Sequence, residues 1–188
     1  MLAPKDIPNV ISVSRILLVF PTVWALLAER FGVALGLFVI AGLSDGLDGY
    51  LAKRYSWQSH LGGILDPLAD KFLLISTYVC LGWLGGLPWW LVGLVLLRDL
   101  VIVVGAVIYN FRVAAFEASP LLISKLNTLL QIILAVLAVV DRGLQPLPTA
   151  LMQGLILLVA LTTVSSGVSY VVLWGRQARR HWQRSDPN

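Results

Sequence analysis

Six long apolar segments recur along the chain, and they limit its fold more than any other feature. Each is close to or above the roughly 20 residues that a helix needs to cross the hydrocarbon core of a bilayer. Hydrophobic residues make up 58% of the 188 residues and charged residues only 13%, against about 25% charged residues in a soluble domain. So few charges exclude a soluble globular, a disordered or a nucleic-acid-binding chain. The sequence predicts an all-α integral membrane protein with six transmembrane helices, at residues 13–28, 32–53, 62–84, 88–110, 121–140 and 147–174.

A short amphipathic helix is expected before the first of these segments. Ile7, Val10 and Ile11 follow the i, i+3, i+4 spacing of a helix that lies in the membrane interface. No soluble domain or low-complexity tract interrupts the rest of the sequence, and the one cysteine, Cys80, lies within an apolar segment. We therefore expect a single membrane domain over residues 1–188.

The basic residues predict the orientation of the chain in the membrane. Six crossings place both termini on one side, and cytoplasmic segments are enriched in Lys and Arg. The basic residues on the side of the termini are Lys5, Arg15, Lys53, Arg54, Arg112, Lys125, Arg176, Arg179, Arg180 and Arg184. Only Arg30 and Arg142 fall on the other side. Both termini should therefore be cytoplasmic, with the basic tail facing anionic lipid head groups.

Four aspartates lie inside the second and third segments, where charged side chains are costly and usually functional. Asp45 and Asp48 are three residues apart and Asp66 and Asp70 four apart, so each pair shares one helical face. The two segments form an antiparallel hairpin, and at about 1.5 Å rise per residue the pairs meet at matching depth near the cytoplasmic end. Four facing carboxylates repel one another unless a cation binds them. Oxygen ligands of this kind predict a site for Mg²⁺ or Mn²⁺, and we expect two ions.

Two interpretations stay open for the other charged residues within the segments and for the glycines near the aspartates. Lys71 could neutralise one carboxylate, and Arg98 could form a structural ion pair with Asp99, or these residues could be functional. Gly42 and Gly46 have the spacing of a helix-packing motif. Glycine also lets a pyrophosphate approach the backbone.

The four aspartates belong to a longer pattern that resembles the signature of the CDP-alcohol phosphatidyltransferase family, D-x2-D-G-x2-A-R-x8-G-x3-D-x3-D. The chain reads Asp45-x2-Asp48-Gly49-x2-Ala52-Lys53-x8-Gly62-x3-Asp66-x3-Asp70. The one departure from the family pattern is Lys53, where the family usually has Arg. Lysine keeps the charge but loses the bidentate geometry of a guanidinium, and the neighbouring Arg54 could take the role of the missing arginine.

This resemblance implies the reaction and the roles of the residues. In the family, metal ions hold the pyrophosphate of a CDP-linked lipid, an alcohol attacks the β-phosphorus, and CMP leaves. Asp45, Asp48 and Asp66 would be metal ligands, and Asp70 would be the general base and also touch the metal. The CDP-diacylglycerol site would consist of Asp45, Asp48, Gly49, Ala52, Lys53, Gly62 and Asp66. The family also implies a homodimer.

Further patterns narrow the choice of the alcohol that accepts the phosphatidyl group. Residues 7–15 contain Ile-Pro-Asn-x2-Ser-x2-Arg, which resembles phosphatidylglycerophosphate synthases and eukaryotic-type cardiolipin synthases alike. Residues 124–131, Ser-Lys-Leu-Asn-Thr-x2-Gln, resemble the cardiolipin synthases, whereas the glycerophosphate enzymes usually carry Lys where Asn127 stands. The resemblance therefore implies transfer of a phosphatidyl group from CDP-diacylglycerol to phosphatidylglycerol. Arg98, Lys125 and Asn127 would bind the phosphate of that acceptor.

Two alternatives remain at this point. One is a phosphatidylglycerophosphate synthase, which uses glycerol 3-phosphate. The other is a divalent-cation transporter, because buried aspartates also line ion pathways, although all four aspartates lie in one half of the membrane. With the Ile-Pro-Asn segment near the start and no transit peptide, we expect a bacterial plasma-membrane protein with its active site on the cytoplasmic side.

Overall fold

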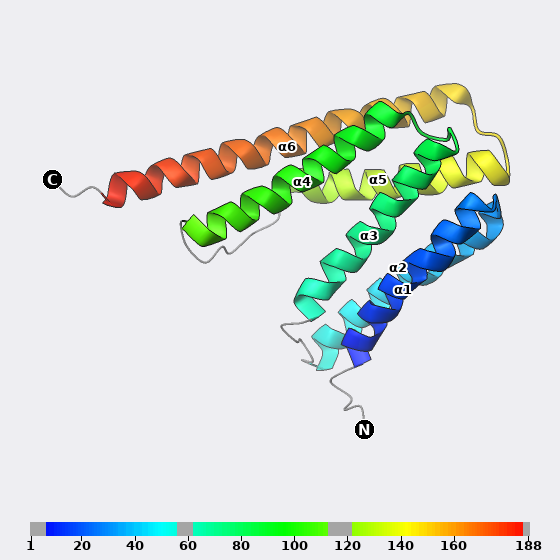
Figure 1. Ribbon diagram of the computed structural model, residues 1–188, viewed down its shortest axis with the longest axis horizontal. Coiled ribbons are helices and arrows are strands. Elements are labelled where there is room, and N and C mark those ends of the chain that lie inside the picture. The colour runs from blue at the N-terminus through cyan, green and yellow to red at the C-terminus, as the bar shows by residue number, and fades with distance from the viewer. Residues whose placement is uncertain (1–6, 56–61, 113–121, 186–188) are drawn as a thin grey trace. The chain divides into compact units, whose positions relative to one another are not determined.

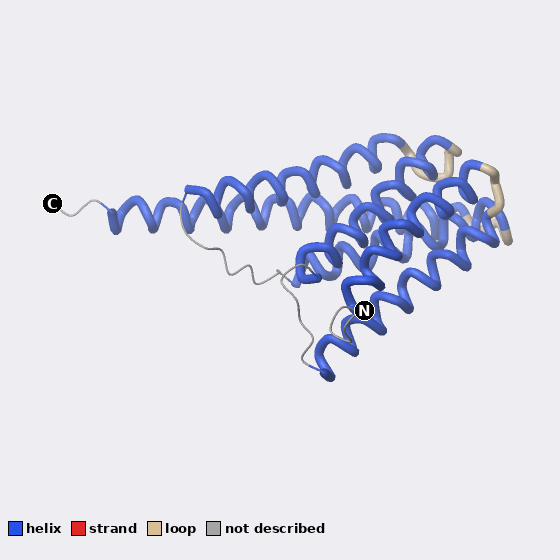
Figure 2. The backbone as a smooth tube through the Cα atoms, turned by 60° about the horizontal axis from the view of Figure 1, so that its bottom comes forward, coloured by secondary structure: helices blue, strands red, loops and turns tan. Residues whose placement is uncertain are grey.

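The computed structural model describes residues 7–55, 62–112 and 122–185, with side chains at residues 11, 13–45, 54–55, 69–105 and 122–173. These residues form helices and short loops, as the predicted all-α fold requires (Figures 1 and 2). The helices of the described ranges are α1 Ile7–Leu27, α2 Phe31–Tyr55, α3 Gly62–Trp83, α4 Trp89–Arg112, α5 Leu122–Gly143 and α6 Thr149–Ser185. The bounds of α2 to α5 lie within about three residues of the segments predicted from hydrophobicity.

Left-handed residues and prolines separate the helices. Glu29 (φ 54°) and Gly85 (φ 70°) adopt the left-handed conformation just after α1 and α3. In each case the next N–H donates to the carbonyl five residues earlier, at 2.8 Å and 2.7 Å, which is a common helix end. Pro88 and Pro148 stand directly before α4 and α6, where the missing N–H of proline is tolerated.

The first and last helices differ from the predicted segments. The expected interfacial helix and the first span form one continuous helix, α1, so the prediction of a separate short helix is wrong. Pro8 falls at its second position, where it interrupts no helical hydrogen bond, and no glycine follows before the helix ends. α6 continues to Ser185, beyond the predicted end at residue 174, because the basic tail consists largely of good helix formers.

The contacts of the chain group into two compact units, which are described separately. The first unit comprises residues 1–88 and 135–148. In it, α1 packs against both α2 and α3, and its fully buried side chains include Leu26, Tyr78 and Leu81. α1 is therefore the helix through which α2 and α3 are joined.

The second unit comprises residues 89–134 and 149–188. Here α4 packs along α6, and Leu91, Leu134 and Val159 are fully buried. Side-chain hydrogen bonds add α5 to this pair. The prediction of a single domain over the whole chain stays a prediction.

The outer faces of the helices are apolar. Large hydrophobic side chains such as Leu17, Phe20 and Leu161 are exposed, which is unusual on a soluble surface. Among the described residues, Leu122–Gly143 and Thr149–Leu173 are long and apolar enough to cross a membrane. This agrees with a membrane protein, while the number of crossings and the side of the termini stay predictions.

Candidate functional site

Arg15 on α1 joins the first and the last aspartate of the signature. Its Nη1 donates to Oδ1 of Asp45 on α2 at 2.8 Å and to Oδ1 of Asp70 on α3 at 2.6 Å. α1 reaches both carboxylates because it packs against both of their helices. Since the two carboxylates share one nitrogen, they lie at the same level of the first unit, which is the arrangement that the predicted depths require.

The exposure of these side chains differs sharply. The side chain of Arg15 is 1% exposed, whereas those of Asp45 and Asp70 are 48% and 49% exposed. A buried guanidinium is tolerated only beside anions, which explains why Arg15 is tied to both aspartates. The carboxylates keep about half of their surface open to a ligand.

The remaining signature residues lie in α2 and α3 or close to them. Their side chains fall outside the described ones, so their roles stay predictions: Asp48, Gly49, Ala52, Lys53, Gly62 and Asp66. Gly42 is described, and a Cβ there would meet no atom within 4 Å. The contacts of the described residues therefore give no support to helix packing at Gly42.

The carboxylates suit a hard divalent cation. Carboxylate oxygens are the ligands that Mg²⁺ and Mn²⁺ prefer, and Asp45 and Asp70 present them on a half-open surface. Among the described side chains, no group of three or more His, Cys, Asp or Glu residues could hold an ion. Asp48 and Asp66, which would complete the predicted set, are not among them. The described part of the site thus shows two of the four carboxylates that the sequence predicts as metal ligands, and the metal itself stays a prediction.

A second polar cluster, in the second unit, surrounds Arg98 on α4. Its Nη1 donates to Asp99 at 2.7 Å, and its Nη2 donates to Ser124 on α5 at 2.5 Å and to Ser166 on α6 at 2.7 Å. Its Nε also donates to Ser166, at 3.2 Å. Arg98 and Asp99 are both buried, so the ion pair considered from the sequence is present. The guanidinium ties three helices together.

Asn127 lies one helical turn after Ser124 on α5 and faces α6. Its Oδ1 accepts hydrogen bonds from the hydroxyls of Thr162 and Thr163, both at 2.9 Å. The residue is fully buried, and its Nδ2 finds no hydrogen-bond partner among the described residues. A buried amide donor without a partner costs free energy, so this nitrogen is a place where a ligand oxygen would be favourable.

The third predicted acceptor residue, Lys125, is exposed. The structure thus brings Arg98 to Ser124, which lies one turn before the buried Asn127 on α5, whereas the exposed Lys125 has no part in these contacts. The exposed position is also that expected of a lysine that extends toward head groups.

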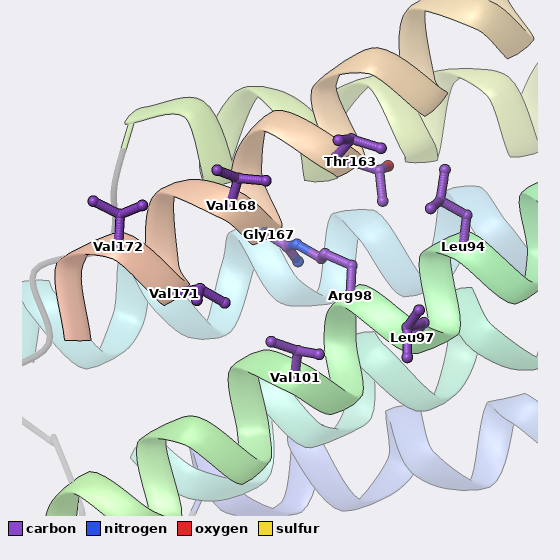
Figure 3. Close-up of a pocket in the computed structure, with 10 residues that line it drawn as sticks. Leu94, Leu97, Arg98, Val101, Thr163, Gly167, Val168, Val171 and Val172 are labelled. Atoms are coloured by element: carbon purple, nitrogen blue, oxygen red, sulfur yellow. The ribbon is translucent and has the colours of Figure 1, made fainter. Parts of the chain in front are cut away.

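A groove of about 320 Å³ runs between α4 and α6 (Figure 3). Valine and leucine side chains form most of its walls, and Arg98 projects across it toward Gly167 (Figure 3). A Cβ at Gly167 would lie 3.7 Å from Cγ of Arg98, an ordinary van der Waals distance, so the arginine stem lies directly beside this glycine. The Arg98 cluster therefore borders an apolar groove.

Three residues of these clusters received no role from the sequence: Arg15, Ser124 and Ser166. Arg15 counted toward the charge bias and closed the Ile-Pro-Asn-x2-Ser-x2-Arg pattern, although a basic residue within an apolar helix is itself unusual. Ser124 opened the pattern at residues 124–131 without a role of its own, and Ser166 carried no comparable feature.

Comparison with known proteins identifies the group to which the chain belongs. The family model for CDP-alcohol phosphatidyltransferase matches residues 5–174. The CMP-forming cardiolipin synthase of Homo sapiens is 33% identical over 183 residues, which cover 89% of this chain and 61% of the relative. The CMP-forming cardiolipin synthase of Streptomyces coelicolor is 39% identical over 104 residues, 52% of this chain and 48% of the relative.

A third relative has a different name. The chloroplastic CDP-diacylglycerol–glycerol-3-phosphate 3-phosphatidyltransferase 1 of Oryza sativa is 34% identical over 192 residues, 93% of this chain and 58% of the relative. The matched region thus spans less than two thirds of each of these three proteins. Because the family model covers nearly all of the sequence, signature included, the chain belongs to the CDP-alcohol phosphatidyltransferase family.

Proposed function

We propose that this chain transfers the phosphatidyl group of CDP-diacylglycerol to phosphatidylglycerol, which forms cardiolipin and releases CMP. The observation that carries the proposal is the meeting of Asp45 and Asp70 at Arg15. It brings together the first and last carboxylates of the signature on which the family's chemistry depends. The two relatives named as CMP-forming cardiolipin synthases support phosphatidylglycerol as the acceptor.

Asp70 is the proposed general base. Its side chain is about half exposed, so the acceptor hydroxyl has access to it. The hydroxyl proton passes to Asp70 while the hydroxyl oxygen bonds to the β-phosphorus; the bond from that phosphorus to the bridging oxygen breaks, and CMP leaves. Asp45, Asp48 and Asp66, with Asp70 also in contact, would hold two Mg²⁺ or Mn²⁺ ions, and these would neutralise charge on the phosphate oxygens.

The polar cluster of the second unit is the proposed acceptor site, formed by Arg98, Lys125 and Asn127. A phospholipid acceptor carries one phosphodiester charge next to apolar chains, and Arg98 is a cation at an apolar groove. Asp99 offsets part of its charge, which suits a monoanion better than a nearly dianionic phosphate monoester. The unpartnered Nδ2 of Asn127 could donate to an acceptor oxygen.

The proposed setting is a membrane that all six helices cross, with both termini and the aspartates on the cytoplasmic side. The apolar outer faces and the basic tail support this arrangement. The proposal also places the protein in a bacterial plasma membrane, and the sequence resemblance supports a homodimer.

Phosphatidylglycerophosphate synthesis from glycerol 3-phosphate is the second candidate. The observation that favours it is the Oryza sativa relative, whose identity of 34% is similar to the 33% of the human cardiolipin synthase. Asn127 argues against phosphatidylglycerophosphate synthesis. This fully buried asparagine is bonded to two threonines and supplies no second cation for a dianionic acceptor.

An acceptor panel tests the proposal. Purified protein in detergent receives CDP-diacylglycerol labelled in its phosphatidyl group, Mg²⁺, and one acceptor at a time: phosphatidylglycerol, glycerol 3-phosphate, serine or inositol phosphate. We expect CMP and labelled cardiolipin with phosphatidylglycerol. Labelled phosphatidylglycerophosphate as the main product, with phosphatidylglycerol ignored, would support the second candidate. No CMP release with any acceptor would contradict both, and divalent-cation uptake into vesicles would then indicate a transporter.

A further inference from the structure

The groove between α4 and α6 is long and has mostly apolar walls. It extends from Leu94 to Val101 on α4 and from Thr163 to Val172 on α6, with a volume of about 320 Å³. At about 1.5 Å rise per residue, these stretches are roughly 10 to 14 Å long. The hydroxyl of Thr163 already donates to Asn127. A ligand that fits these walls is therefore apolar and elongated.

The rim of the groove is open on the outer face of the helices. Leu97 on α4 and Val168 and Val171 on α6 line the groove and are each more than half exposed. A groove left empty between two helices loses packing contacts, and acyl chains are the solvent of membrane helices. An acyl chain therefore suits the groove, and it can enter sideways from the bilayer.

A cation lies at this apolar groove. Arg98 is the charged residue among those that line it, and its side chain projects from α4 toward Gly167 (Figure 3). Its Nε and both N–H groups of Nη2 donate to Ser124 and Ser166, and one N–H of Nη1 donates to Asp99. The other N–H of Nη1 has no acceptor among the described residues. A phosphodiester oxygen can therefore bind there while every present partner of Arg98 stays in place.

We propose that the groove between α4 and α6 holds one acyl chain of the acceptor phosphatidylglycerol, while Arg98 binds the phosphodiester of the same lipid. This inference rests on the proposed function, because it assigns a place to the chain of the acceptor. A soluble acceptor such as glycerol 3-phosphate has no part that fills the groove. The groove thus selects a lipid acceptor by shape, and Arg98 selects an anionic lipid by charge.

Photo-crosslinking tests this placement without turnover. Phosphatidylglycerol with a diazirine in one acyl chain is added to the full chain in phosphatidylcholine nanodiscs, and mass spectrometry locates the labelled residues after illumination. We expect labels on both walls, at residues 94–101 and 163–172. Excess unlabelled phosphatidylglycerol should remove most of these labels, whereas the same amount of extra phosphatidylcholine should leave them.

Leu161 provides the control for lipids that merely surround the protein. It is exposed on α6 but does not line the groove, so its labelling should not respond to unlabelled phosphatidylglycerol. Groove labels that are no more sensitive than those at Leu161, or that phosphatidylcholine removes equally, would overturn the proposal. Walls without labels, as expected if a second copy of the chain covers the groove, would overturn it as well.

A matched pair of substitutions tests the groove by filling it. Val171→Trp places an indole in the groove, and Leu161→Trp places one about 15 Å away on the same helix. Val171→Trp should lose the labels that respond to phosphatidylglycerol. It should also raise the KM for dioleoyl phosphatidylglycerol about tenfold, because overpacking is costly, and affect the short-chain dihexanoyl lipid less. Leu161→Trp should behave as the wild type, and equal effects of the two substitutions would contradict the inference.

The two measurements separate this inference from the proposed function. Cardiolipin formation without groove labels that respond to phosphatidylglycerol would leave the proposed function intact and reject the groove as the place of the chain. Such labels without cardiolipin in the acceptor panel would show a phosphatidylglycerol site and reject the acceptor role of the bound lipid.

Discussion

The hydroxyl of Ser166 on α6 accepts two hydrogen bonds from the guanidinium of Arg98 on α4, from Nη2 at 2.7 Å and from Nε at 3.2 Å. Ser124 accepts another from Nη2, and Asp99 accepts one from Nη1. Together these partners fix the plane of a buried guanidinium. If Arg98 binds the acceptor phosphate, Ser166 determines how the guanidinium is presented to it.

Replacing Ser166 by Ala should therefore weaken acceptor binding more than nucleotide binding. A hydrogen bond to a charged group contributes about 1.5–3 kcal/mol, and about 1.4 kcal/mol corresponds to a factor of ten. We expect the KM for phosphatidylglycerol to rise about tenfold while the KM for CDP-diacylglycerol stays near its wild-type value. Initial rates of CMP release at varied concentrations of each substrate measure both constants.

Two variants control for a purely structural effect. Ser166→Thr keeps the hydroxyl and should restore most of the affinity for phosphatidylglycerol. Ser165→Ala changes an exposed neighbour on the same helix and should behave as the wild type. A fall in Tm with both KM values unchanged would show that Ser166 only packs the helices.

The helices follow from local properties of the sequence, which is why most of their bounds could be predicted. Apolar length locates α2 to α5, and Gly85 and Pro88 mark the turn between α3 and α4. The interfacial and first membrane segments merge into α1 because apolar spacing alone does not place a helix end when no breaking residue lies where the segments meet. Pro21, further along, lies inside the continuous helix. The left-handed Glu29 gives no sign in the sequence, since non-glycine residues seldom adopt this conformation.

The two clusters show where sequence reasoning reaches its limit. Helical spacing within two neighbouring segments is a local property, and it places Asp45 and Asp70 near each other. The position of Arg15 between them depends on how α1 packs against both helices, which hydrophobicity does not specify. The same holds for Ser124 and Ser166, which are far apart in the sequence and meet only through Arg98.

The substitution Asp70→Asn should distinguish the role of general base from the role of metal ligand. Asparagine keeps the shape and an oxygen that can accept from Arg15, but it cannot take a proton from the acceptor. We expect the rate of transfer to fall by about 10²-fold or more, while CDP-diacylglycerol still binds. Single-turnover transfer and equilibrium binding of CDP-diacylglycerol measure the two effects. An Asp70→Asn protein with near-normal turnover would place the base elsewhere.

Removal of divalent cations should abolish the reaction. The four aspartates that the sequence predicts at matching depth need cations to hold a pyrophosphate, so EDTA should stop CMP release, and added Mg²⁺ or Mn²⁺ should restore it. Asp45→Ala should reduce metal binding and nucleotide binding together. CMP release that continues at full rate in excess chelator would contradict a metal-dependent reaction.

Gly143→Ala should destabilise the first unit. A Cβ at Gly143, at the end of α5, would overlap the side chain of Phe31 at its Cβ, which cannot move without the backbone. Forcing atoms into a packed contact costs about 1–3 kcal/mol, so the Tm in detergent should fall by several degrees. Gly154→Ala on α6 is the matched control, because its Cβ would meet no atom within 4 Å. Equal Tm values for the two variants would argue against the close contact.

Lys125→Ala offers the cleanest test of the proposed acceptor site. Lys125 is exposed, so its loss should leave the Tm unchanged, whereas Arg98→Ala also breaks the bonds that join three helices. If Lys125 contacts the phosphodiester, its replacement should raise the KM for phosphatidylglycerol about three- to tenfold, because a partly exposed ion pair contributes about 1 kcal/mol. The KM for CDP-diacylglycerol should stay the same. Thr128→Ala, one turn further along α5, removes only a hydroxyl that bonds to its own helix and should change neither constant. An unchanged KM for phosphatidylglycerol in Lys125→Ala would show that this lysine extends to the head groups and does not bind the acceptor.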